Sequence, residues 1–222
     1  MSLSVSITRP LIVISAGNRI LIRDLLAIHM YRTSTTSTVI SCHPNSEPQR
    51  ASAKRLQSLV RRAEDSAHWS KVFRRSKDPT FVFLVILWYA QCAWDEAFAA
   101  LDHYINCLVG HFIASFSALT PPQESDVFQG SDAQLSRKLH RLQTHILYYQ
   151  QLLEEFRLSV EFIRDTPNSA MNVVTSTEEE RTDSVQLLRK EADSLIFEIE
   201  RLRGHSKVVF ERVQNDIHLV RV

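Results

Sequence analysis

The sequence predicts a mainly α-helical protein of the α+β class, in which a small N-terminal α/β piece precedes three long helices forming an antiparallel coiled-coil-like bundle. Two series of apolar residues at alternating steps of four and three predict the bundle, because that spacing places them along one side of a helix. Glycine is also scarce, with 4 residues in 222, so long helices are not interrupted. We expect two regions, residues 1–77 and residues 78–222.

The first part of the chain predicts strands. Residues 10–15 and 19–23 are runs rich in β-branched residues on either side of a Gly-Asn turn signal, which predicts a hairpin. Residues 20–30 fit a short helix equally well. Residues 33–41 are rich in threonine and valine and predict a further strand, which nearby prolines end.

Residues 49–77 predict one basic helix, with nine Lys and Arg against Glu64 and Asp65. Such a segment is either a patch for nucleic acid or phospholipid, or a solvated helix face with its complement elsewhere in the fold. We favour the second interpretation, because no glycine-rich phosphate loop accompanies the charge and because Trp69 and Phe73, four residues apart, suit packing. We therefore expect no nucleic-acid partner.

The first long helix should run over about residues 78–116. Asp78 is a good N-cap, and Pro79 suits the first helical turn. Its apolar run, Phe81 to Trp94, is 14 residues long and is followed by two acids. A membrane span needs about 20 apolar residues, so the run predicts a helix buried in protein and no direct membrane span in this chain.

Two further helices are expected over about residues 131–165 and 177–222, joined by a short polar link. Consecutive helices with matching heptads should pack antiparallel. The apolar residues expected at their contact are called the helix-packing seam. They are Leu135, Leu139, Leu142, Ile146, Tyr149, Leu153, Phe156, Val160, Ile163, Leu188, Leu195, Ile199, Leu202, Val209 and Val213.

Known catalytic and cofactor motifs do not occur in this sequence. There is no Gly-x-Ser-x-Gly, no P-loop and no Gly-x-Gly-x-x-Gly. The nine histidines are dispersed without the pair spacing that puts two ligands on one zinc ion. The three cysteines form no Cys-x-x-Cys pair, and we expect reduced, buried thiols in a cytosolic environment. We expect no enzyme, no catalytic residue and no certain cofactor.

Two carboxylate pairs, Asp95/Glu96 and Glu154/Glu155, are the candidates for a metal site. A hard divalent cation such as Mg²⁺ prefers oxygen ligands and is often held by one or two carboxylates. The favoured interpretation is a solvated polar face opposite the apolar stripe. Metal ligands are therefore left unassigned.

Four segments together carry a resemblance: RDLLAIHMYRTSTTSTVISCHP, SKDPTFVFLVILWYAQCAWDEAFAALDHYI, LHRLQTHILYYQQLLEEFRLSVEFI and EADSLIFEIERLRGHSKVVFERVQNDIHLV. They resemble the cytosolic part of fungal CorA-like magnesium transporter proteins over roughly residues 11–220. The resemblance implies a small α/β module, then long helices, the last of which is a stalk continuing into a membrane helix. It also implies a cytoplasmic location, Mg²⁺ as the ion, and self-association or co-assembly with full-length relatives, which form homopentamers.

The sequence departs from that family at the pore. Family members carry Gly-Met-Asn between two membrane helices, whereas Ala170-Met171-Asn172 follows Pro167 in a polar linker and is not expected to be a pore loop. The chain stops at Val222 within a helical pattern, which suggests a truncated member without the pore. The expected function is a regulatory or assembly role in a CorA-like divalent-cation transporter. The alternative is a soluble coiled-coil adaptor, unrelated to transport, that binds another helix.

Overall fold

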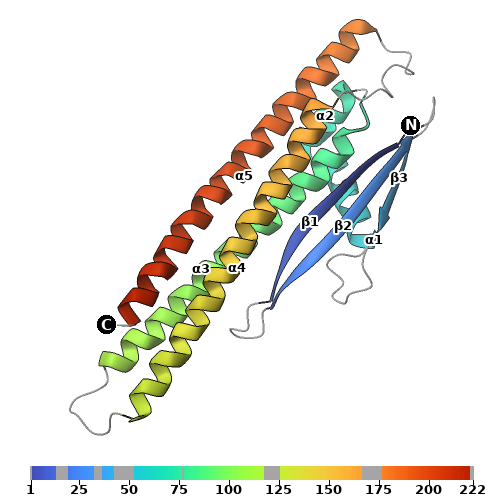
Figure 1. The fold of residues 1–222 in the computed structure, drawn as a ribbon. Helices are drawn as coiled ribbons and strands as arrows, with labels where there is room; N and C mark the ends of the chain where they lie inside the picture. Colours follow the sequence, from blue (N-terminus) through green and yellow to red (C-terminus); the bar gives the residue numbers. More distant parts are fainter. Residues whose placement is uncertain are drawn as a thin grey trace.

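The computed structural model describes residues 2–13, 20–32, 37–42, 53–76, 78–117, 126–166 and 177–220. Within these ranges the chain is mainly helical, with a small antiparallel sheet beside three long helices (Figure 1), so the predicted fold class is confirmed. The elements are β1 (Ser2–Val13), β2 (Ile20–Arg32), β3 (Ser37–Cys42), α1 (Ala53–Asp65), α2 (Ala67–Arg75), α3 (Phe81–Ser117), α4 (Asp126–Asp165) and α5 (Glu178–Val220).

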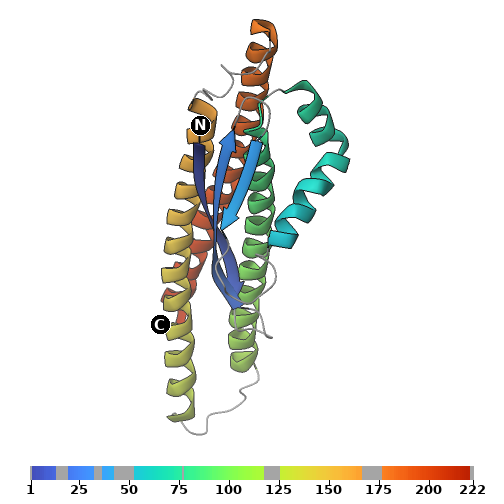
Figure 2. The same ribbon diagram turned by 90° about the vertical axis from the view of Figure 1, so that its right-hand side faces the viewer.

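The three strands pair in the order β1-β2-β3, both pairs antiparallel. The predicted hairpin is present but longer than expected, and residues 20–30 are strand rather than helix. The predicted Gly-Asn turn lies outside the described residues. Ile28 and Met30, two residues apart on β2, share one face of the sheet and are buried, whereas Tyr31 is exposed. Figure 2 shows the sheet on one side of α3 and α4, with α5 on the other side.

The single basic helix predicted over 49–77 is wrong, because the chain breaks into α1 and α2 at Ser66. Ser66 has extended backbone angles, and its Oγ accepts a hydrogen bond of 3.5 Å from the N–H of Trp69. Serine at such a position satisfies an N–H that the first turn of a helix leaves unpaired. Trp69 and Phe73 pack against the core, as their spacing predicted.

Asp78 caps α3, although the helix itself begins three residues later at Phe81. Its Oδ1 accepts hydrogen bonds from the Thr80 N–H at 2.9 Å and from Thr80 Oγ1 at 2.6 Å. By length and composition, Phe81–Gly110 is the one described helical stretch that could cross a membrane, and 61% of its most apolar window is buried inside the protein. This stretch is longer than the apolar run considered in the sequence, and α3 contacts β1, α1, α4 and α5.

The helices α4 and α5 run antiparallel along most of their length (Figure 1). α4 begins at Asp126, five residues before the predicted start. α5 begins with a capping box: the Glu180 N–H donates to Thr177 Oγ1 at 3.2 Å, and the Thr177 N–H donates to the Glu180 carboxylate at 3.1 Å. The acids of this first turn also lie at the positive end of the helix dipole.

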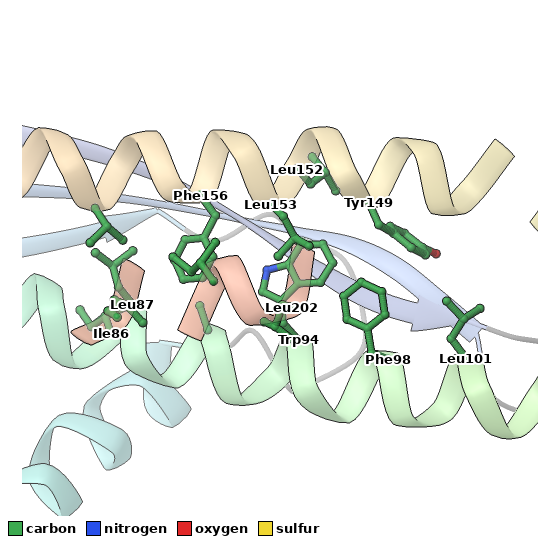
Figure 3. Close-up of a cluster of buried hydrophobic side chains, with 14 of the residues drawn as sticks. Ile86, Leu87, Trp94, Phe98, Leu101, Tyr149, Leu152, Leu153, Phe156 and Leu202 are labelled. Atoms are coloured by element: carbon green, nitrogen blue, oxygen red, sulfur yellow. The ribbon is translucent and has the colours of Figure 1, made fainter. Parts of the chain in front are cut away.

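All fifteen residues of the helix-packing seam are buried, and all belong to one core cluster with residues of α3 and β2. Figure 3 shows side chains of α3 and α4 meeting Leu202 of α5. Trp94 and Phe98 stack with ring centroids 5.9 Å apart, and Tyr149 meets Trp94 edge-on at 6.0 Å. The seam of α4 therefore faces α3 as well as α5, and large aromatic rings fill the space between the three helices.

Candidate interaction surface

Potential metal-binding and nucleophilic side chains do not converge in the described part of the chain. No group of three or more His, Cys, Asp or Glu side chains that could hold a metal ion occurs there. Cys107 Sγ lies 3.6 Å from His103 Nε2, one turn earlier on α3, but no third ligand joins them among the described residues. Cys92 is exposed and Cys107 partly exposed, so the prediction of buried thiols is wrong for both. Partial desolvation and the nearby carboxylates of Asp95 and Glu96 raise the pKa of Cys92, which disfavours the reactive thiolate.

The first member of each carboxylate pair is partly exposed and contacts an arginine of α5. Asp95 accepts a hydrogen bond of 2.6 Å from Gln91 and one of 2.6 Å from Arg201 of α5. Glu154 lies 2.6 Å from Arg157 and 3.1 Å from Arg203 of α5. The hydrogen bond from Arg157, reinforced by Arg203, lowers the pKa of Glu154. A divalent cation would therefore have to displace arginine from the first carboxylate of each pair.

Polar contacts hold α5 on both of its flanks. Toward α4 it is joined by the ion pairs Arg157–Glu200 at 3.7 Å, Arg164–Asp193 at 3.0 Å and Glu154–Arg203 at 3.1 Å. Toward α3 it is joined by Asp95–Arg201 at 2.6 Å, Asp102–His205 at 2.8 Å and Asn106–Arg212 at 2.5 Å. These contacts fix the rotation of α5 about its own axis, so its remaining side faces away from the core.

The outward sides of α4 and α5 carry large apolar residues at matching intervals. On α5, Phe197, Val208 and Leu219 follow one another at steps of eleven and are 70%, 64% and 73% exposed. On α4, Leu147 and Leu158 are also eleven apart, and both are 51% exposed. Eleven residues are close to three helical turns, so each set lies along one side of its helix. We call these five residues the outer rows.

The two outer rows lie level with each other. The ion pairs Arg157–Glu200 and Glu154–Arg203 set the antiparallel register, in which residue numbers rise on α4 as they fall on α5. That register puts Leu158 near the height of Phe197 and Leu147 near the height of Val208. Single exposed apolar residues are normal on protein surfaces, whereas two rows with the same spacing on adjacent helices form a pattern.

An open hollow of about 770 Å³ lies beside Phe197, between α3 and the first half of α5. Its lining combines Trp88 and Phe197 with charged side chains, among them Arg189, Lys190 and Asp193. The indole N–H of Trp88 is buried without an acceptor among the described residues. Apolar surface beside charged groups is typical of a contact site for another protein.

Heptad analysis located the buried side of α4 and α5 but missed the outer rows. Their residues fall outside the steps of four and three, and only a search for spacings of eleven would have grouped them. The chain matches no known protein family, no curated protein and no solved structure.

Proposed function

We propose that the chain is the cytosolic-type domain of a CorA-like divalent-cation transporter and serves there in assembly or regulation, with copies associating through the outer rows. No described residue is proposed to conduct ions. The four resembling sequence segments support the lineage, and they fall mainly on β2, α3, α4 and α5. The observation that carries the assembly role is the pair of outer rows.

Matching spacings make contact between two copies physically reasonable. The row on α4 of one copy has the same interval as the row on α5 of another, so the two can interdigitate without a change in either helix. Burial of a fully exposed Phe, Val or Leu side chain contributes roughly 1.5–3 kcal/mol. Because the rows hold few residues, we expect weak self-association, consistent with a contact completed by other parts of an assembly.

Sedimentation of the purified chain over a range of concentrations, with and without magnesium, tests this proposal. We expect self-association that magnesium alters, and we expect Val208→Asp to weaken it by roughly tenfold or more, because a charge would be buried in the contact. Val185→Asp is the control, since Val185 lies on the same helix, is 40% exposed and falls outside the rows.

Three outcomes contradict the assembly role. The first is that the purified chain stays monomeric at all concentrations, and the second is that Val208→Asp and Val185→Asp have equal effects. The third is that magnesium does not change the association of the chain and that the chain forms a stable complex with an unrelated protein. The last outcome supports the coiled-coil adaptor instead, in which an outer row binds a foreign helix.

A further inference from the structure

The basic helix pair, defined as α1 and α2, concentrates the positive charge of the protein. Residues 49–77 contain nine of the chain's 26 Lys and Arg but only two of its 25 Asp and Glu, so the rest of the chain has 17 basic and 23 acidic residues. The near-neutral total therefore conceals a strongly cationic segment on an otherwise acidic protein.

Six basic side chains on this pair are exposed: Lys54, Arg61, Arg62, Lys71, Arg74 and Arg75. None of them forms an ion pair with a carboxylate that the structure describes. On the long helices, by contrast, Arg157, Arg164 and Arg201 each reach a carboxylate. The sequence analysis expected acidic residues elsewhere in the fold to pair with this positive face. The described part of the fold contains no such ion pairs.

Packing turns the cationic side of the helix pair outward and holds it there. Val60, Trp69 and Phe73 pack against the core, and α1 contacts α3. His68 Nε2 lies 3.1 Å from the buried Glu191 carboxylate, which ties α2 to α5. Figure 2 shows α1 and α2 standing beside α3, on the side away from α4. The charged side chains therefore project from a fixed position.

We propose that the basic helix pair docks the protein on a membrane surface containing acidic phospholipids. Clusters of four to eight Lys and Arg bind such surfaces by electrostatic attraction. Four of the six exposed basic residues are arginines, whose planar guanidinium groups suit phosphate oxygens. Val60, Trp69, Val72 and Phe73 of the pair pack in or against the core, so contact with the headgroups occurs without their insertion into the acyl chains.

The packing of the pair favours a membrane over nucleic acid. The pair stands out beside α3 (Figure 2), where a flat surface can meet it along its outer side. Trp69 and Phe73 pack against the core, which leaves them little ring surface for base stacking.

Co-sedimentation with lipid vesicles tests the proposal. We expect the purified chain to bind phosphatidylcholine vesicles that contain phosphatidylserine but not vesicles of phosphatidylcholine alone, and we expect added salt to release it. The double variant Arg74→Gln/Arg75→Gln should lose roughly thirtyfold in partition coefficient, since each basic residue near the surface contributes roughly fivefold. A second double variant, Arg61→Gln/Arg62→Gln, should lose a similar factor.

The control is Arg137→Gln/Lys138→Gln, which removes the same charge from two neighbouring, exposed basic residues on α4. It should bind vesicles as the unchanged chain does, and circular dichroism should show all variants folded. Equal binding to both kinds of vesicle, or equal losses in the control and the α2 variant, would overturn the proposal. Tighter binding to a duplex oligonucleotide than to the acidic vesicles at the same salt concentration would overturn it in favour of nucleic acid.

Discussion

At the scale of single residues, Tyr149 shows how the core changes side-chain chemistry. It belongs to the seam of α4, contacts Trp94 edge-on and is almost fully buried. Burial, with a smaller contribution from Tyr148, raises the pKa of Tyr149 to about 12. Burial disfavours the phenolate because its charge would lose hydration.

The raised pKa of Tyr149 predicts a loss of stability in alkali. An unfolded tyrosine has a pKa of about 10, so the folded state holds the proton more tightly. The stabilising contribution is complete below about pH 10 and is lost as the pH rises toward 12. We expect Tyr149→Phe to reduce this alkaline loss in the free energy of unfolding, measured by urea denaturation across that range. Tyr148→Phe, at the exposed neighbour, should retain most of the loss; equal behaviour of the two variants would contradict the assignment.

At the scale of elements, the spacing of apolar residues predicted which side of each long helix is buried. The seam could be found from the sequence because a long amphipathic helix buries one side, and the apolar residues on that side follow at steps of four and three. Element ends were less predictable, because one capping serine at Ser66 is enough to divide a helix, and because weak local preferences decide where α4 begins. The outer rows were missed because nothing in the described part of the chain covers them.

The register of α4 predicts opposite outcomes for one substitution at two nearby leucines. Leu153 is fully buried, whereas Leu158 on the same helix is 51% exposed. Leu153→Asp should lower the free energy of unfolding by about 3 kcal/mol or more, since it leaves an unpaired charge in the core. Leu158→Asp should change it by less than about 0.5 kcal/mol in the dilute monomer. Chemical denaturation of both variants measures the difference, and similar losses would mean that the seam is misplaced by part of a turn.

At the scale of the whole molecule, the sheet and the long helices share one core. The sequence suggested two regions divided near residue 77, because strand-like and helical patterns are separated along the chain. Strand periodicity does not say which helix will cover a sheet, so the packing of the sheet on α3 and α4, which β1 contacts, could not be derived from it. Ile28 and Met30 nevertheless belong to the same cluster as Leu84, Trp94 and Phe156.

A shared core predicts that a change in the sheet destabilises the helices. Ile28 is 1% exposed, so Ile28→Ala should cost about 2–4 kcal/mol through lost burial and the cavity left behind. The control is Ile40→Ala on β3, because Ile40 is 52% exposed and its loss should cost less than about 0.5 kcal/mol. The measurement is thermal unfolding followed by far-ultraviolet circular dichroism, whose signal comes mainly from α3, α4 and α5. If Ile28 supports the whole fold, this helical signal melts at a lower temperature in a single transition. Helices that melt unchanged in Ile28→Ala would show instead that the sheet and the bundle fold as separate units.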